Sequence, residues 1–547
     1  MYTLGINSAF HDSAACILKD GELLAAAEDE RFTHIKHGKR PIPFSTYEIP
    51  FHSIFYCLEV AGIHINDVDH FAYSFDPAFL RAPEHPSFMQ AVTNARLHLR
   101  DGYPHHLQKR FINTVIPESK WRYVEHHLAH AASAFHASPF EEAAVMTIDG
   151  RGEYATTSYY IGHGNDLQQI GQVGLPHSLG LLYEKMTTYL GFLHSSDEYK
   201  VMALASYGKP VFADIFRSMI NITNDGSYAI TNDDFEKHFG APRKRDDPFT
   251  ECHFNIANSL QLVLEESVLQ LTNWLHDETG MENLCMAGGV ALNCVMNARI
   301  RDKGPFRNIW VQPAAGDSGT ALGAALWIDA KERKSHTRAF RMDHTYWGPE
   351  YTDEQIEKFL KWTKTPFKKL GNVAKQTAEI LAQDKIIGWF QGRMEFGPRA
   401  LGSRSILASP INPSMQARLN EVKDREDFRP VAPVVMEEYA NEWFVNATCS
   451  PFMLFIYDVR PEKADKIPAV RHVDGTARIQ TVNSAQHPAY YNLLDEFRQL
   501  TGVPVLVNTS FNTLGKPIVC TPRDAVECFW ASPFDALVMG SFLIEKA

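Results

Sequence analysis

The sequence predicts an α/β protein whose first domain consists of two similar lobes and whose second domain folds separately. Three observations support this prediction. Two β-rich segments, near residues 2–32 and 142–163, share a pattern of strand, tight turn and strand. Two later segments, 284–300 and 309–328, change from a strand-like run to a helical run at small residues. A charged stretch over 331–355 then interrupts the apolar periodicity and separates the last ~200 residues.

Each lobe begins with a predicted hairpin. In "YTLGINSAFHDSAACILKDGELLAAAEDERF", Asp20 and Gly21 are the residue types that a tight turn prefers. In "EAAVMTIDGRGEYATTSYYIGHG", Asp149 and Gly150 stand at a Gly-rich turn. A duplication of this kind, with a nucleotide between the lobes, resembles the plan of the actin and sugar-kinase superfamily.

The two strand-to-helix turns predict places where the backbone lies close to a ligand. Gly288 and Gly289 follow the strand in "LCMAGGVALNCVMNARI", and Asp317 lies in the loop of "IWVQPAAGDSGTALGAALWI". Small residues let a phosphate or sugar approach the backbone, and helix N–H groups receive anions. Tight packing by glycine is the alternative at either turn.

The second domain follows the charged connection "KERKSHTRAFRMDHTYWGPEYTDEQ". A helix is predicted directly after it, in "DEQIEKFLKWT". We place the boundary between residues 345 and 346, which gives domains 1–345 and 346–547.

The composition excludes several classes of protein. The 547 residues are 45% hydrophobic and carry a net charge of −12, whereas a general nucleic-acid binder would show a basic domain. No apolar run is long enough to span a membrane, and the first residues do not form a signal peptide. The eight cysteines include no C-x-x-C pair, so we expect reduced thiols in a cytoplasmic protein. The composition leaves open whether the protein forms a homo-oligomer.

The stretch "EHHLAHAASAFH" places His126 and His130 on one face of an Ala-rich helix, because positions i and i+4 share a face. The zinc-protease pattern H-E-x-x-H is absent, since His127 occupies the position of its Glu. Alone, such a pair is more often a surface or capped feature of a helix than a metal site. Carboxylates elsewhere in the chain must therefore complete any site.

Ten motifs span nearly the whole chain: "GINSAFHDSAACIL", "AEDERFTHIKHG", "HHLAHAASAF", "TIDGRGE", "SLGLLYE", "AGGVALN", "GDSGTALGAA", "GRMEFGPRALGSRSIL", "VKDREDFRPVAP" and "NTSFN". In this order they resemble the O-carbamoyltransferase family. That family includes antibiotic carbamoyltransferases of the tobramycin and cephamycin kind and the nodulation protein NodU.

The resemblance implies a fold for each domain and a metal site. The first domain would be actin-like, a ribonuclease H-like duplication of the ASKHA superfamily, and similar to the threonylcarbamoyl-transferring enzyme of tRNA modification. The second would be an α/β domain similar to YrdC. His127 would support the metal site or lie at the surface. The donor set suits Fe²⁺ first, and also Mn²⁺ or Zn²⁺, with the implied ligands His126, His130, Asp149 and Asp317.

The resemblance also implies where ATP binds. The chain has no Walker P-loop, so ATP with Mg²⁺ would be recognised by the actin-like cleft. Taken alone, Glu184 would be an exposed helical carboxylate. The implied nucleotide-binding residues are Gly180, Glu184, Lys200, Gly288, Gly289, Asn293 and Asp317.

The resemblance also implies that His11 is the general base, with Asp12 beside it as the second catalytic residue, because "FHD" matches the family's motif at both positions. An alcohol is a weak nucleophile, and a histidine with a near-neutral pKa can take its proton. The alternative is that His11 is a core residue whose hydrogen bonds are all made within the protein. Contacts with the acceptor or phosphate are expected nearby from Arg31, Lys36 and His37.

Basic residues cluster between Arg393 and Arg429, interrupted by Gly and Pro, so they do not form one helix face. Guanidinium groups bind phosphate with two hydrogen bonds, whereas a nucleic-acid site would need interleaved aromatic residues. Ile479 stands where the family usually has Pro. The resemblance implies that carbamoyl phosphate is bound by Arg399, Arg404, Lys423, Arg429, Arg478, Asn508 and Ser510, with Asn512 nearby.

The implied function is ATP-dependent O-carbamoyl transfer. Carbamoyl phosphate and ATP would give carbamoyl adenylate in the second domain, and the first domain would transfer the carbamoyl group to a hydroxyl of a small molecule, a natural product such as an antibiotic. The alternatives are a tRNA threonylcarbamoyl-type transferase and a non-catalytic nucleotide-binding scaffold. The acceptor pocket would come from loops near 75–115 and 210–255, which have no legible motif.

Overall fold

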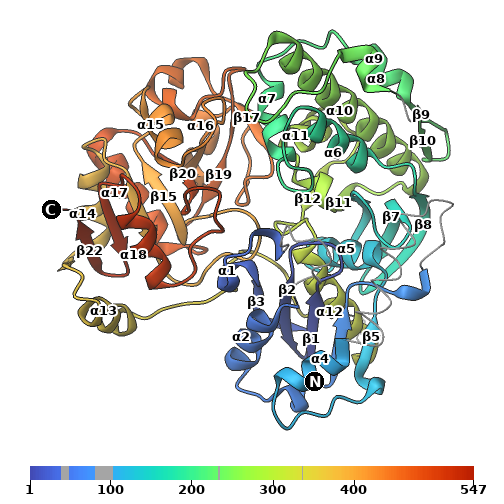
Figure 1. Cartoon of the computed structure of the whole chain (residues 1–547), viewed down its shortest axis with the longest axis horizontal. Helices are drawn as coiled ribbons and strands as arrows, with labels where there is room; N and C mark the ends of the chain where they lie inside the picture. Colours follow the sequence, from blue (N-terminus) through green and yellow to red (C-terminus); the bar gives the residue numbers. More distant parts are fainter. Residues whose placement is uncertain (39–48, 80–102, 232–233, 335–336, 547) are drawn as a thin grey trace. The chain divides into compact units, whose positions relative to one another are not determined.

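The computed structural model describes residues 1–38, 49–79, 103–231, 234–334 and 337–546 (Figure 1). They form two compact units, Met1–Met342 and Asp343–Ala547. None of the helices in these ranges has the length and hydropathy that a bilayer span requires.

The first lobe of the first unit is a five-stranded sheet with the order β3-β2-β1-β4-β5. Its strands are β1 Tyr2–Asn7, β2 Ala14–Lys19, β3 Glu22–Glu28, β4 His70–Tyr73 and β5 Trp121–Tyr123. The β2–β3 turn is the predicted Asp20–Gly21 pair, and both residues have positive φ (52° and 88°), as a two-residue hairpin turn requires. Helix α2 (Phe51–Ala61) packs on β2 and β3.

The second lobe repeats this arrangement. Its sheet has the order β12-β11-β6-β7-β8, formed by β6 Glu142–Ile148, β7 Ala155–His163, β8 Asp166–Gly174, β11 Asn283–Ala287 and β12 Asn308–Val311. In both sheets the first three strands are antiparallel neighbours, the fourth pairs in parallel with the first, and the fifth pairs in parallel with the fourth. The same topology twice confirms the predicted duplication, and the first unit has the two-lobed, actin-like fold.

Two helices hold the first unit together. α12 (Ser318–Arg333) packs on β1, β2 and β4, and α5 (His126–Phe135) packs on β6 and β11. They lie against each other, and Gly323 allows this close approach because a Cβ there would overlap the Ala129 carbonyl oxygen.

A group of helices is inserted after β8. It comprises α6 Leu179–Tyr189, α7 Glu198–Ala205, α8 Ala213–Met219 and the 29-residue α10 Glu251–Thr279. α10 packs on α7, α8 and α11 (Cys294–Lys303), as Figure 1 shows. The short helix α11 follows the predicted Gly288–Gly289 turn after β11.

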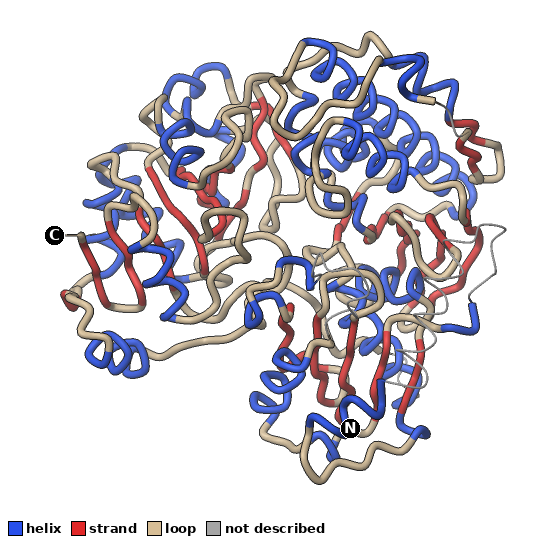
Figure 2. Tube along the Cα trace, viewed as in Figure 1, coloured by secondary structure: helices blue, strands red, loops and turns tan. Residues whose placement is uncertain are grey.

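The second unit is an α/β domain around an eight-stranded mixed sheet, visible as red strands in Figure 2. The order is β13-β22-β21-β14-β15-β20-β16-β19. The strands are β13 Lys368–Lys369, β14 Ile387–Phe390, β15 Arg404–Ala408, β16 Ala432–Met436, β19 Gln480–Val482, β20 Val505–Ser510, β21 Ala536–Met539 and β22 Phe542–Glu545.

The helices beside this sheet include α13 Asp353–Trp362, α14 Val373–Leu381, α15 Met415–Val422, the short α16 Ala440–Trp443, α17 Pro488–Thr501 and α18 Pro522–Trp530. α14 and α17 pack against each other, and a large apolar core runs through sheet and helices, with Trp389 and Trp443 fully buried in it. The predicted α/β class is confirmed for this domain, whereas its likeness to YrdC stays a prediction.

Candidate active site

Four polar side chains from separate segments meet in the interior of the first unit. His126 and His130 lie one turn apart on α5, Asp149 directly follows β6, and Asp317 precedes α12. All four are buried, and one ligand atom from each lies within 4.8 Å of the others. The helix face and the two turns singled out in the sequence therefore converge on one point.

Hydrogen bonds aim these side chains at a common centre. His126 Nδ1 donates to the Ser74 carbonyl oxygen at 3.1 Å, so Nε2 is the ring nitrogen directed at the cluster. The Gly289 N–H donates to Asp149 Oδ1 at 2.8 Å and leaves Oδ2 facing the histidines. The distances from the two Nε2 atoms to the carboxylates of Asp149 and Asp317 then range from 3.5 to 3.9 Å.

The cluster leaves polar atoms unsatisfied that a divalent cation would satisfy. Nε2 of His126, Nε2 of His130 and both oxygens of Asp317 are buried with no hydrogen-bond partner among the described residues. A buried carboxylate without a partner costs free energy. Two imidazoles with two carboxylates are a donor set that borderline divalent metals accept. The residues therefore fit a metal ion of this kind.

The carboxylates change the protonation of the cluster. Burial lowers the pKa of His126, but the charges of Asp317 and Asp149 outweigh burial and hold this pKa well above its usual value. Burial raises the pKa of Asp317, yet His11 and His126 outweigh it and lower this pKa well below its ordinary range. The cluster therefore favours a protonated His126 beside ionised carboxylates when no metal is bound.

His127 belongs to the packing beneath the cluster. It is fully buried, so the surface position considered for it is wrong, and its Nδ1 lies 2.8 Å from Thr147 Oγ1 on β6. Burial, followed by the charge of His130, lowers the pKa of His127 to about 3. His127 is thus a neutral imidazole that supports the helix carrying the two predicted ligands.

His11 lies beside the cluster, next to Asp12. Its Nδ1 is 2.9 Å from Asp12 Oδ2 and 3.7 Å from Asp317 Oδ2. Burial alone would raise the pKa of Asp12. The charges of His37 and His11 outweigh burial and hold this pKa well below its usual range, so the carboxylate is ionised. The structure thus brings the two predicted catalytic residues against the predicted metal ligands.

The other basic residues predicted near His11 have different surroundings. Arg31 is buried and forms ion pairs with Glu30 at 2.7 Å and Glu28 at 3.4 Å. Lys36 Nζ lies 6.0 Å from the ring centroid of Tyr199. Arg31 is therefore part of an internal ion-pair network.

Three glycines predicted at the nucleotide site surround Asp149. At Gly180 a Cβ would stand 2.7 Å from the Asp149 carbonyl oxygen, and at Gly288, with φ of 96°, it would overlap the Ile148 carbonyl oxygen. Gly289 donates to the Asp149 carboxylate. Tight packing, the interpretation left open for the Gly288 turn, accounts for Gly180 and Gly288 by itself. Nucleotide contact at these glycines stays a prediction.

The remaining predicted nucleotide residues lie on the helical insert and at its edge. Glu184 Oε2 accepts from Ser195 Oγ at 2.7 Å, and Lys200 Nζ lies 3.2 Å from Asp197 Oδ2. Asn293 caps α11 through its side chain. Each side chain therefore has a structural contact, and nucleotide binding by all three stays a prediction.

In the second unit, three of the predicted basic residues lie at strand ends: Arg404 begins β15, Lys423 contacts the end of β20, and Arg429 precedes β16. Lys423, directly after α15, donates through Nζ to the Ser510 carbonyl oxygen at 2.6 Å. It also donates to the Asn512 carbonyl oxygen at 2.8 Å and to Asn512 Oδ1 at 2.7 Å. Arg429 lies three residues before β16 and 3.5 Å from Glu426.

Asn508 on β20 joins the segments that carry Arg399 and Arg478. Its Nδ2 donates to the Ala400 carbonyl oxygen at 3.2 Å and to Gln480 Oε1 at 2.7 Å. Asn508 Oδ1 is buried with no hydrogen-bond partner in the described part of the chain. Asn508 therefore ties these segments together and keeps one acceptor unused.

Arg404 is buried and hydrogen-bonded to the backbone around it. The side chain is fully buried, and its guanidinium carbon lies 3.6 Å from the ring centroid of Phe390. Its two terminal nitrogens donate to the carbonyl oxygens of Pro349, Gln391, Gly392 and Ser403. Arg404 thus fastens two segments of backbone to the start of β15.

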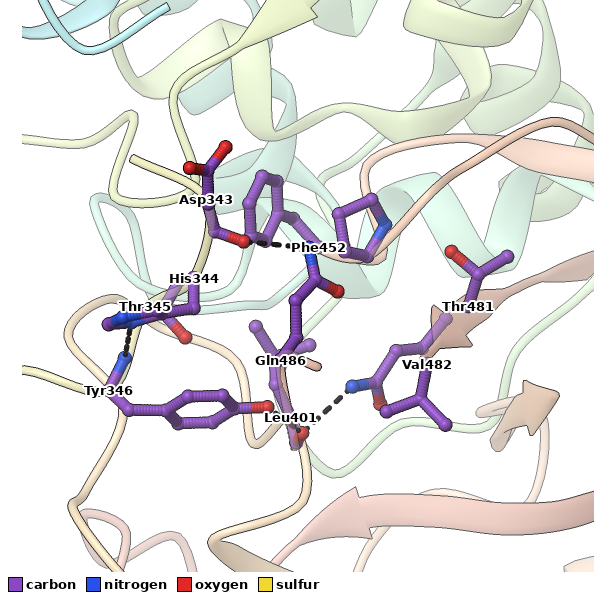
Figure 3. A pocket seen from close by; sticks show the side chains of 11 residues that line it. Asp343, His344, Thr345, Tyr346, Leu401, Phe452, Thr481, Val482 and Gln486 are labelled. Carbon is purple, nitrogen blue, oxygen red and sulfur yellow. Dashed lines mark hydrogen bonds between the residues drawn. The ribbon is translucent and has the colours of Figure 1, made fainter. Parts of the chain in front are cut away.

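The arginine-rich loop is further fixed at Leu401, which lines a small pocket together with Tyr346 and Thr481 (Figure 3). The Leu401 carbonyl oxygen accepts from Tyr346 Oη at 2.9 Å and from Gln480 Nε2 at 2.8 Å, while its N–H donates to Glu395 Oε1 at 2.7 Å. Sequence reasoning missed these three residues, since no motif marks a side chain that holds a backbone segment in place.

Comparison with known families decides between the interpretations of this chain. The models of the carbamoyltransferase N-terminus and the carbamoyltransferase C-terminus match residues 2–326 and 378–546. The chain belongs to the carbamoyltransferase family. The predicted resemblance is therefore confirmed, and a transferase of this family is established at this level.

Relatives in the family cover the chain over its length. The uncharacterized protein sll1178 of Synechocystis is 41% identical over 100% of this chain and 97% of its own. The nodulation protein NolNO of Sinorhizobium fredii is 40% identical over 99% of this chain and 80% of its own. The solved phosphate- and nucleotide-bound HypF covers 61% of this chain and 56% of its own, at 15% identity and a TM-score of 0.34, which is too low to add to the assignment.

Proposed function

We propose that the chain is an ATP-dependent O-carbamoyltransferase that uses carbamoyl phosphate and modifies a hydroxyl of a small molecule. One observation carries this proposal: in a chain of this family, a buried donor set for a metal ion lies beside an imidazole, with His11 Nδ1 3.7 Å from Asp317. A metal donor set next to a histidine base suits the activation of a hydroxyl group.

The first half-reaction is assigned to the second unit. Water cleaves carbamoyl phosphate to carbamate and phosphate, and a carbamate oxygen then attacks the α-phosphorus of ATP. An O–P bond forms, pyrophosphate leaves, and carbamoyl adenylate remains. The phosphate group would be bound by the guanidinium and ammonium groups, which suit phosphate oxygens. These belong to Arg399, Lys423, Arg429 and Arg478, with Ser510 beside Lys423.

Two residues of this unit have roles that follow from their hydrogen bonds. Asn508 keeps a buried Oδ1 acceptor, which matches an N–H donor of a carbamoyl group. Arg404 was predicted to bind phosphate, but its donors are directed at backbone carbonyls. We therefore assign Arg404 to holding the arginine-rich loop in place.

The second half-reaction is assigned to the first unit. The acceptor oxygen attacks the carbamoyl carbon, AMP leaves, and the hydroxyl proton passes to His11. Because Asp12 faces Nδ1 of His11, the proton would be taken by Nε2. The predicted nucleotide residues, among them Glu184, Lys200 and Asn293, would bind the adenylate here, and Mg²⁺ would accompany ATP.

A divalent metal would be held by His126, His130, Asp149 and Asp317, with Fe²⁺ expected before Mn²⁺ or Zn²⁺. Its chemistry would be to offset negative charge on phosphate oxygens. The second metal-like group, Asp12, Glu30 and His37, is bridged by its own hydrogen bonds.

The acceptor is proposed to be a small molecule, and a natural product in antibiotic biosynthesis fits the resemblance. Of the loops expected to line its pocket, residues 80–102 and 232–233 lie outside the described residues. Transfer to tRNA and a non-catalytic scaffold are the other functions considered. The first unit keeps the candidate metal ligands and the second keeps the candidate basic residues, which argues against a non-catalytic scaffold. The net charge of −12 argues against tRNA as the acceptor.

Release of pyrophosphate from ATP tests the proposal. We expect release only when carbamoyl phosphate is present, and the same rate with and without added tRNA. Release without carbamoyl phosphate would contradict the first half-reaction. A requirement for tRNA would favour the threonylcarbamoyl-type alternative.

A further inference from the structure

We propose that His37 is a positioning residue that fixes the orientation and tautomer of His11 through Asp12. The inference rests on the proposed function only in the role given to His11. The arrangement concerned is a chain of three side chains, His11–Asp12–His37, at the edge of the candidate metal cluster.

The Asp12 carboxylate binds two imidazoles, one on each oxygen. Oδ2 lies 2.9 Å from His11 Nδ1, and Oδ1 lies 2.7 Å from His37 Nδ1. The backbone adds a second link, because the Asp12 N–H donates to the His37 carbonyl oxygen at 2.9 Å. His37 therefore holds Asp12 at two points.

His37 is itself held on all sides. Its N–H donates to Glu30 Oε2 at 2.6 Å, and Nε2 lies 3.2 Å from Ser196 Oγ. The residue adopts φ of 60°, a left-handed conformation that costs free energy outside glycine and persists only where surrounding contacts enforce it. Asp12 shares this feature with φ of 51°.

These contacts distinguish a positioning role from a catalytic one. Both ring nitrogens of His37 already face protein groups, Asp12 and Ser196, so the ring has no nitrogen directed at a substrate. A carboxylate that faced His11 alone could rotate and present either oxygen. With Oδ1 bound to His37, only Oδ2 remains for His11.

The consequence for His11 is a single tautomer. An N–H on Nδ1 donating to Asp12 Oδ2 leaves the lone pair on Nε2, because the hydrogen bond made by one ring nitrogen sets the state of the other. In a serine-protease triad the same logic applies between Asp and His, and loss of the correct tautomer there lowers kcat by about 10⁴-fold. Here the second imidazole secures the orienting carboxylate.

Four variants separate this role from general packing. Asn places an amide nitrogen where His carries Nδ1, so His37→Asn keeps the donor to Asp12. His37→Gln and His37→Ala remove it. Ser196→Ala removes only the contact at Nε2 and is the matched control. Melting temperature shows whether each variant folds.

The readout is the ¹⁵N–¹H correlation spectrum of the His11 ring in the full chain labelled with ¹⁵N-histidine, assigned among the 24 histidines by His11→Gln. We expect one tautomer, with Nδ1 protonated, in the native protein, in His37→Asn and in Ser196→Ala. His37→Ala and His37→Gln should give a mixture of both tautomers.

An unchanged His11 spectrum in His37→Ala would overturn the proposal. So would a change in Ser196→Ala as large as in His37→Ala, because the effect would then come from packing. The spectrum needs neither ATP nor acceptor. If the native protein lacks carbamoyl phosphate-dependent pyrophosphate release, the proposed function fails while the positioning role is still measured.

Discussion

Metal binding should displace a proton from His126. In the metal-free protein this imidazole is held protonated at neutral pH, because Asp317 and Asp149 raise its pKa well above the usual value against the effect of burial. A metal ion requires the neutral Nε2. The proton must therefore leave as Fe²⁺, Mn²⁺ or Zn²⁺ enters.

The magnitude follows from one titrating group. About one proton should be released per ion, so the apparent affinity should rise roughly tenfold per pH unit up to the raised pKa of His126 and level off above it. The stability of the metal-free protein should change in the opposite sense. The ion pair contributes fully below the unfolded-state pKa of about 6.5, and its contribution is lost as pH rises through the folded-state pKa.

Calorimetric titration with Mn²⁺ or Zn²⁺ in two buffers of different ionisation enthalpy counts the protons. His126→Ala should bind the ion more weakly and release almost no proton. His127→Gln is the matched control and should behave as the native protein, because the neutral His127 has no proton of this kind to lose. Ion binding without proton release, or undiminished affinity in His126→Ala, would refute the reasoning.

Two further predictions concern the other unit and the turn beside Asp149. Arg399→Ala should lose roughly 1.5–3 kcal/mol of the free energy of binding to phosphate. The carbamoyl phosphate concentration needed for pyrophosphate release should therefore rise about 10- to 100-fold, while ligand binding in the first unit persists. If pyrophosphate release depends on carbamoyl phosphate concentration as in the native protein, Arg399 is not part of the site. Gly288→Ala should cost about 1–3 kcal/mol from its backbone conformation alone, plus the overlap with Ile148, seen as a lower melting temperature. Gly150→Ala, whose Cβ would meet no atom closer than 3.8 Å, should melt almost as the native protein, and equal melting of both variants would contradict the packing argument.

The sequence predicted the parts of this molecule that depend on local patterns. The Asp20–Gly21 turn needs residues that tolerate positive φ, and the spacing of His126 and His130 follows the helical period. These are properties of neighbouring residues. The convergence of Asp149 and Asp317 on the histidines came from the family resemblance, because they lie far apart in the chain and only the duplicated fold brings them together.

Hydrogen-bond partners from distant segments could not be read from the sequence. Arg404 looks like any phosphate-binding arginine until the Pro349 carbonyl oxygen is found against it. The second imidazole on Asp12 was similarly hidden, although His37 had been singled out for acceptor or phosphate contact. Gly288 illustrates the reverse case, in which a signal for ligand approach is also explained by close packing against Ile148.

Trapping the adenylate tests the central claim most directly. Enzyme mixed with [α-³²P]ATP and carbamoyl phosphate, quenched within a single turnover and separated by chromatography, should contain a labelled species other than ATP and AMP that requires carbamoyl phosphate. His11→Ala should accumulate it, because loss of a general base slows transfer about 100- to 10,000-fold while the first half-reaction continues. If carbamoyl transfer proceeds and no such species forms in either protein, the carbamoyl group does not pass through an adenylate and the account is contradicted.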